Sequence, residues 1–207
     1  MGRLMVGGRG GTLGGAAEML IARGDLDARV GELASQIASD RDHRSDPLLL
    51  IGVLKGSTLF LADLMRALHM EVAVDFMSIS SYQEGVVQSG VVRIVKDLDE
   101  DIVGRDVLIV EDIVDTGLTL NYLRRTLSER RPRSLRAVTL LDKSARRIVP
   151  VELEFSGFEI PDVFVVGYGL DFQGRYRNVP DILAVTDLGR LINDPLLLVG
   201  DVFTSRA

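Results

Sequence analysis

Two short, uninterrupted apolar runs constrain the fold of this chain more than any other feature of its sequence. They occupy residues 48–53 and 107–110 and are too short for typical helices, which need about ten residues or more. Neither run shows the polar alternation of a half-exposed strand, so both indicate strands that are covered on both faces, as in a parallel sheet. The sequence therefore predicts an α/β fold with a largely parallel central sheet.

Helical and strand-like patterns alternate around these two runs. Apolar residues recur at helical spacing after Asp25, a predicted N-cap, and again after Ser57, which we predict to cap a helix ending at Met70. Further elements are predicted as strands at residues 72–79, 91–95, 135–141 and 163–166 and as a helix at 118–127. The alternation predicts an α/β domain with some antiparallel additions to the sheet.

Two segments lack this periodicity. Residues 1–18 are rich in glycine, with six glycines between positions 7 and 15, and such a segment buries little apolar surface. We predict that it is a disordered extension and that residues 19–207 form a single domain. Residues 80–90 combine turn formers with no clear period, which predicts a long loop of the kind that often acts as a lid.

Composition excludes several classes of protein. The chain has 207 residues, no Cys and two His, which excludes disulfide scaffolds, thiolate nucleophiles, Cys-ligated zinc and three-His metal sites. Its longest apolar stretch, residues 48–54, is far shorter than the ~20 residues of a membrane span, so we expect a cytoplasmic protein. The formal net charge, 24 − 30 = −6, argues against a protein that mainly binds nucleic-acid backbones.

Three acids, Glu111, Asp112 and Asp115, follow the apolar run at residues 107–110. In open α/β sheets, ligands bind at the carboxyl ends of strands. A Thr-Gly-x-Thr turn at residues 116–119 comes next, and its backbone N–H groups, with the start of the following helix, suit a phosphate. Because carboxylates repel phosphate unless magnesium or sugar hydroxyls lie between them, this window predicts a ligand with phosphate on one side and a diol or metal on the other.

Two other interpretations of this window stay open on the residues alone. Glu111 and Asp112 could simply end a strand while Asp115 caps the next helix, as Asp often does. The acid pair also resembles the magnesium-binding strand of a response-regulator receiver. The window lies at mid-chain, however, and a receiver leaves the Thr-Gly-x-Thr turn unexplained.

The acids and the turn together resemble the phosphoribosyl-pyrophosphate motif of the type I phosphoribosyltransferases. Other segments match, in the same order, the branch of that family that acts on hypoxanthine and guanine. They are Leu54-Lys55-Gly56-Ser57, Ser81-Tyr82, 89–98, 140–143 and 157–171. The resemblance covers about residues 25–190 and implies a mostly parallel central sheet flanked by helices, a small hood and a flexible loop. It also implies purine salvage, in which a 6-oxopurine and phosphoribosyl pyrophosphate give IMP or GMP and pyrophosphate.

The resemblance implies roles for the acids and the turn. Asp115 corresponds to the general base that takes the proton from the attacking ring nitrogen of the purine. Glu111 and Asp112 correspond to the residues that address the ribose hydroxyls around one magnesium ion, and Asp171 to a ligand of a second magnesium. The loop that holds the 5′-phosphate corresponds to Thr116, Gly117, Leu118 and Thr119.

The same resemblance implies that a loop after the first apolar run binds pyrophosphate. Leu54, Lys55 and Gly56 match this loop, in which an unusual cis peptide precedes the Lys. Arg177 is a further residue that the resemblance directs to pyrophosphate. Leu54, Lys55 and Gly56 lie directly after a predicted buried strand, which favours the pyrophosphate loop over a plain turn with an exposed Lys.

The purine and the lid account for the remaining matched residues. Lys143 corresponds to the Lys that donates to the 6-carbonyl of the purine. Phe164 corresponds to the ring that stacks on the base, and the backbone of Val165 would hydrogen-bond the edge of the base. Ser81 and Tyr82 resemble the mobile loop that closes over the reaction and keeps water out.

The resemblance further implies a magnesium cofactor, small-molecule substrates and a homo-oligomer, either a dimer or a tetramer, with no nucleic-acid or membrane partner. The alternative function is a regulator of the same fold that binds a nucleotide or RNA. Such a regulator needs a basic face, and the candidate residues are Arg124, Arg125, Arg130, Arg131, Arg133 and Arg136. The negative net charge favours a solvated helix face and turn instead.

Overall fold

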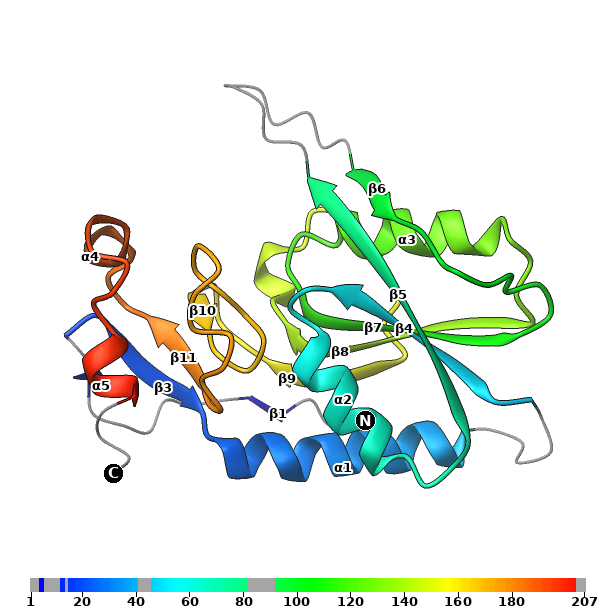
Figure 1. Ribbon diagram of the computed structural model, residues 1–207, viewed down its shortest axis with the longest axis horizontal. Helices are drawn as coiled ribbons and strands as arrows, with labels where there is room; N and C mark the ends of the chain where they lie inside the picture. The colour runs from blue at the N-terminus through cyan, green and yellow to red at the C-terminus, as the bar shows by residue number, and fades with distance from the viewer. Residues whose placement is uncertain (1–3, 6–11, 14, 41–45, 82–91, 204–207) are drawn as a thin grey trace.

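A computed structural model describes residues 4–5, 12–13, 15–40, 46–81 and 92–203 of the chain. Its main feature is a seven-stranded sheet with the order β1-β9-β8-β7-β4-β5-β6 (Figure 1). The strands are β1 (Leu4–Met5), β4 (Leu48–Leu54), β5 (Val72–Ser81), β6 (Val92–Lys96), β7 (Asp106–Val114), β8 (Ser134–Asp142) and β9 (Phe155–Glu159). Neighbouring strands are parallel except for the antiparallel pair β5 and β6, which confirms the predicted α/β architecture.

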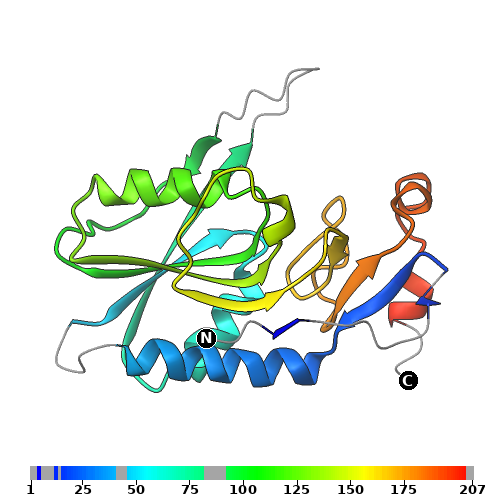
Figure 2. The same cartoon turned by 180° about the vertical axis from the view of Figure 1, so that it is seen from behind.

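Helices cover both faces of this sheet, as the continuous apolar runs predict (Figures 1 and 2). The helices are α1 (Arg23–Ser39), α2 (Thr58–Ala67) and α3 (Leu118–Ser128), with the 3-10 helix η1 (Ser144–Arg146) after β8. Along β4, Leu50 belongs to the core that contains α1 and α2, whereas Leu49 and Ile51 belong to the core that contains α3. Alternate side chains of one strand therefore enter two different cores, and this is why the run carries no polar residue.

A second, smaller sheet forms the hood. Its four antiparallel strands have the order β10-β11-β3-β2, and two short helices lie beside it (Figure 2). They are β2 (Thr12–Leu13), β3 (Ala17–Ile21), β10 (Phe164–Val166), β11 (Ile182–Val185), α4 (Leu188–Asn193) and α5 (Val199–Phe203). The hood thus combines strands from the two ends of the chain.

The prediction of disorder at residues 1–18 is wrong for the part of that segment that the structure describes. Residues 12–13 pair with 17–18 in the hood, and residues 4–5 pair with β9. Glycine made this segment look unstructured, but Gly15 takes a left-handed φ of 64° between the two hood strands, a conformation that glycine adopts at little cost. The division into an extension and a domain from residue 19 stays a prediction.

One of the two predicted helix caps is wrong. Helix α1 begins at Arg23 with Ala22 as its N-cap, so Asp25 lies within the first turn. Ser57 is the N-cap residue of α2 as predicted, but its hydroxyl donates to the Val53 carbonyl at 2.6 Å and bonds to no helix N–H. The predicted lid lies mostly outside the described residues, since residues 80–81 extend β5 and 82–90 are not described. In the described part of the chain, no helix is long and apolar enough to cross a membrane.

Candidate active site

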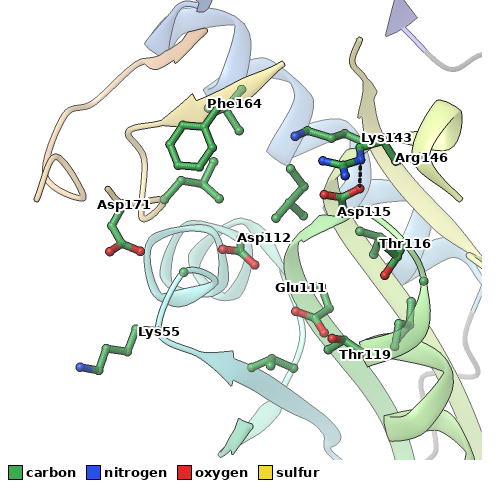
Figure 3. Close-up of a pocket in the computed structure, with 18 of the residues that line it drawn as sticks. Lys55, Glu111, Asp112, Asp115, Thr116, Thr119, Lys143, Arg146, Phe164 and Asp171 are labelled. Carbon is green, nitrogen blue, oxygen red and sulfur yellow. Dashed lines mark ion pairs between the residues drawn. The ribbon is translucent and has the colours of Figure 1, made fainter. Parts of the chain in front are cut away.

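A pocket of about 720 Å³ opens where the carboxyl ends of β4, β7 and β8 face the hood strand β10 (Figure 3). The lining includes most of the residues predicted from the sequence. They are Leu54, Lys55, Gly56, Glu111, Asp112, Asp115, Thr116, Gly117, Thr119, Lys143, Phe164, Val165, Asp171 and Arg177. Of the other predicted residues, Leu118 begins α3 outside the lining, Ser81 is the last residue of β5, and Tyr82 lies outside the described residues. The fold therefore gathers segments more than a hundred residues apart into one site.

The Thr-Gly-x-Thr turn at residues 116–119 leads into α3. Gly117 is the N-cap residue with a left-handed φ of 84°, and a Cβ there would lie 2.9 Å from the Val149 carbonyl oxygen. The Leu118 N–H points back to the Thr116 hydroxyl at 3.4 Å, and the Thr116 carbonyl accepts from Ile148 at 3.0 Å. Thr116, Gly117 and Thr119 all line the pocket, so the N-terminus of α3 lies beside it, and the backbone N–H groups of a helix N-terminus suit a phosphate.

The acid pair lies deeper, at the end of β7. The carboxylates of Glu111 and Asp112 both turn toward the pocket (Figure 3). Burial, followed by repulsion from Asp112, raises the pKa of Glu111 well above its usual value, and burial raises the pKa of Asp112 to about 6. Glu111 Oε1 is buried without a hydrogen-bond partner. A buried acid with an oxygen that lacks a partner, next to a second carboxyl whose pKa is also raised, is an environment that a cation or hydroxyl donors would stabilise.

Gly56 brings the loop after β4 against this acid pair. The peptide bond between Leu54 and Lys55 is cis, as the resemblance implies. An added Cβ at Gly56 would overlap the carboxylate of Asp112, and one at Gly169 would overlap the Gly56 carbonyl oxygen. The backbone of the loop therefore touches both β7 and the segment after β10, with no room for a side chain at either contact.

Asp171 lies on the same side of the pocket as Lys55 in Figure 3, and Arg177 forms an ion pair with it. Asp171 pairs with Arg177 at 2.7 Å and accepts the Gly174 N–H at 2.6 Å, while Arg177 also donates to the Gly169 carbonyl at 2.6 Å. Among the described residues, no group of three or more His, Cys, Asp or Glu side chains is placed to hold a metal ion. Asp171 thus lines the pocket, but in the described part of the chain it does not form one metal-binding cluster with Glu111 and Asp112.

A buried tyrosine fixes the segment that carries these residues. Tyr168 is fully buried, and its hydroxyl donates to Asp63 on α2 at 2.6 Å. The Arg23 guanidinium lies 5.4 Å from the centre of its ring and 3.1 Å from the Asp63 carboxylate. Since α2 starts directly after the Lys55 loop, this contact ties the two walls of the pocket together.

Lys143 and Phe164 face each other across the other end of the pocket (Figure 3). Lys143 is 6% exposed at the end of β8, and its burial lowers its pKa. Phe164 packs edge-on against Phe172 at 6.0 Å, and Val165 follows it in β10, which pairs with β11. An aromatic face, a buried ammonium group and strand backbone suit a flat heterocycle with a carbonyl oxygen.

Other residues, which were not predicted from the sequence, also line the pocket. The described lining also contains Val53, Ile79, Ile113, Val114, Leu120, Arg146, Asp162, Val163, Leu170 and Leu188. Arg146 Nε lies 3.4 Å from Asp115 and 3.6 Å from Asp162. The one sequence signal for Arg146 was its position three residues after Lys143, where a helical turn returns it to the same site.

The candidate basic face is largely neutralised. Five of its six arginines pair with acids, namely Arg124 with Glu154, Arg125 with Glu129, Arg130 with Asp97, Arg133 with Asp106, and Arg136 with Asp40. Arginines that are occupied by carboxylates contribute little to the accumulated positive charge on which backbone binding depends. The pairing favours the solvated face over a nucleic-acid surface.

Known proteins resemble this chain closely. The family model described as phosphoribosyl transferase domain matches residues 10–173. The hypoxanthine phosphoribosyltransferase of Escherichia coli (strain K12) is 50% identical over 165 residues, which cover 80% of this chain and 93% of that protein. The hypoxanthine-guanine phosphoribosyltransferase of Mycobacterium bovis is 51% identical over 170 residues, which cover 80% and 84%. A crystal structure of a hypoxanthine-guanine phosphoribosyltransferase from Bacillus anthracis aligns with a TM-score of 0.76 at 44% identity, over 81% of this chain and 98% of that chain.

Proposed function

This chain belongs to the phosphoribosyl transferase family, and we propose that its pocket joins a free 6-oxopurine to the ribose of phosphoribosyl pyrophosphate. The substrates are hypoxanthine, guanine or both, and the products are IMP or GMP and pyrophosphate. The chain is thus a hypoxanthine(-guanine) phosphoribosyltransferase, a pentosyl-transferring enzyme of purine salvage. Family membership makes the receiver interpretation wrong.

One observation carries the assignment of the site: a phosphate turn, an acid pair and a slot for a heterocycle line the same pocket. We assign the 5′-phosphate to the turn formed by Thr116, Gly117, Leu118 and Thr119. The ribose hydroxyls fall to Glu111 and Asp112, and pyrophosphate to Leu54, Lys55, Gly56 and Arg177. Thr116 and Thr119 lie on one side of the view in Figure 3, Glu111 and Asp112 in the middle, and Lys55 on the other side. This order supports the assignment because the 5′-phosphate, ribose and pyrophosphate follow one another in the substrate.

The purine occupies the slot between Lys143 and Phe164. Lys143 donates to its 6-carbonyl oxygen, Phe164 stacks on its ring, and the backbone of Val165 reads its edge. Asp115 then lies at the end of β7 beside the five-membered ring, where it accepts the proton of the attacking nitrogen as the bond to the anomeric carbon forms. Ser81 and Tyr82 are proposed to exclude water from the oxocarbenium-like transition state.

The acid pair also fits a magnesium ion. Glu111 has a buried oxygen without a hydrogen-bond partner, and the pKa values of both carboxyls are raised, so a cation would relieve an uncompensated cluster. Glu111 and Asp112 would hold one magnesium, and Asp171 would hold another on the pyrophosphate side. Bound there, magnesium supplies positive charge between these carboxylates and the anionic substrate. A dimeric or tetrameric assembly remains a prediction.

A spectrophotometric assay with magnesium and phosphoribosyl pyrophosphate tests the function. We expect turnover of hypoxanthine, guanine or both, and far slower turnover of adenine, because the 6-amino group of adenine cannot accept a hydrogen bond from Lys143. Xanthine is the fourth base in the comparison. Turnover of adenine alone, or of none of the four bases, would contradict the proposal.

Replacing Lys143 tests the purine slot. We expect Lys143→Ala to lower kcat/KM for hypoxanthine by about ten- to a hundredfold, the worth of a hydrogen bond to a charged group. The KM for phosphoribosyl pyrophosphate should change little, because Lys143 lies at the other end of the pocket. Lys96→Ala on β6, outside the pocket lining, is the matched control. An unchanged kcat/KM for every 6-oxopurine would remove Lys143 from the site.

A further inference from the structure

Four charged side chains gather at the purine end of the pocket: Lys143, Arg146, Asp115 and Asp162. The guanidinium of Arg146 lies beside Lys143 and forms an ion pair with Asp115 (Figure 3). The same atom, Arg146 Nε, is 3.4 Å from Asp115 Oδ1 and 3.6 Å from Asp162 Oδ1. One arginine is therefore shared almost evenly between a carboxylate inside the pocket and a carboxylate at its rim.

Asp115 Oδ1 has two competing uses. The atom is buried and makes no hydrogen bond, and Asp115 lines the pocket, so the lone pairs of this oxygen are not used by any hydrogen-bond donor. In the proposed reaction a carboxylate oxygen of Asp115 must accept the N–H of the purine. In the structure Arg146 lies against this oxygen at ion-pair distance, and the purine must compete with it.

Arg146 is able to move. Its side chain is 50% exposed, it belongs to the 3-10 helix η1, and its contact with Asp115 lacks hydrogen-bond geometry. Asp162 is likewise exposed and comes just before β10, the strand that begins with Phe164. Because exposed charge pairs are weak, exchange of one carboxylate for the other requires little rearrangement of the fold.

We propose that Arg146 is a positioning residue that pairs with Asp115 in the empty pocket and passes to Asp162 when a purine binds to Asp115. This inference rests on the proposed function. In the empty site, Arg146 compensates the charge of the base. In the occupied site, Asp162 keeps the guanidinium away from the purine. It also keeps the guanidinium away from Lys143, because Arg146 disfavours the charged form of the Lys143 amine, whereas Asp115 and Asp162 favour it.

The proposal makes Asp162 act on the purine chiefly through Arg146, and a double-mutant cycle separates this dependence from the direct effect of Asp162 on Lys143. We expect Asp162→Asn to raise the KM for hypoxanthine about two- to fivefold, the size of an exposed charge pair, because Arg146 is then left on Asp115. The KM for phosphoribosyl pyrophosphate should stay unchanged. In an Arg146→Gln background the same substitution should have a clearly smaller effect, the part that passes through Lys143, and in an Arg146→Lys background it should again raise the KM for hypoxanthine about two- to fivefold.

Each result decides the matter. An equal effect of Asp162→Asn in the presence and absence of Arg146 would mean that Asp162 acts on the purine without Arg146. No effect of Asp162→Asn on the wild-type background would mean that Arg146 is not shared. Either result overturns the inference. A parallel rise in both KM values would indicate a structural defect and also contradict it. Wild-type turnover is measured first, since an inactive wild-type enzyme contradicts the proposed function, whereas an active enzyme with additive variants contradicts this inference alone.

Discussion

Asp115→Asn is expected to lower kcat by about a hundred- to ten-thousandfold, the range that a positioned general base contributes. The amide has the shape of the carboxylate and can still accept a hydrogen bond, but it cannot take the proton of the attacking purine nitrogen. The KM for phosphoribosyl pyrophosphate should change far less, because the phosphate turn and the acid pair keep their places. Steady-state kinetics with each substrate varied in turn measures the two effects.

A binding measurement separates this role from a positioning role. Calorimetric titration of Asp115→Asn with phosphoribosyl pyrophosphate should give an affinity near that of the wild type. Equal losses in kcat and in this affinity would mean that Asp115 positions the substrate and is not the base. Asp25→Asn, in the first turn of α1, is a control that removes one carboxylate far along the chain from the site and should leave all three constants unchanged.

Gly56→Ala is expected to have the second large effect. A Cβ at this position would fall on the carboxylate of Asp112, so either the loop or the acid pair must move. We expect kcat/KM for phosphoribosyl pyrophosphate to fall at least about a hundredfold, which corresponds to about 2.7 kcal/mol in transition-state stabilisation. Even a displacement of about 1 Å in a site of this kind has such a cost.

Gly31→Ala is the matched control for that substitution. Gly31 lies in the middle of α1, and an added Cβ there meets no atom within 4 Å. Its replacement should leave kinetics unchanged and raise the free energy of unfolding by about 0.5–1 kcal/mol, since Ala is the better helix former. Wild-type kcat/KM in Gly56→Ala would show that the contact between the loop and Asp112 is dispensable.

The central sheet could be predicted from the sequence because its middle strands have a strong sequence pattern, the continuous apolar runs. Residues 48–53 of β4 and 107–110 of β7 are all buried, on one face of the sheet or the other, and these two runs contain no polar side chains. The hood has a weaker pattern. Strand β3 has five residues and follows a glycine-rich stretch, and it becomes a strand because β11 from the far end of the chain pairs with it.

The residues of the site also fall into those that could be predicted from the sequence and those that could not. Residues that lie close together in sequence, such as the acids of β7 and the turn that follows, could be assigned from their order. The contact between Gly56 and Asp112, the anchor from Tyr168 to Asp63, and the sharing of Arg146 depend on distances between separate segments. No local pattern encodes these distances, so they could not be predicted.

The hood has a consequence for how this enzyme can be altered. In the proposed assignment, Phe164 and Val165 of the small sheet contact the ring and the edge of the base. The acid pair lies in the large sheet, and the phosphate turn and Lys143 directly follow two of its strands. Protein engineers who wish to direct the enzyme to unnatural bases have a natural target in Phe164 and Val165, where variation leaves Lys143, the acid pair and the phosphate turn in place.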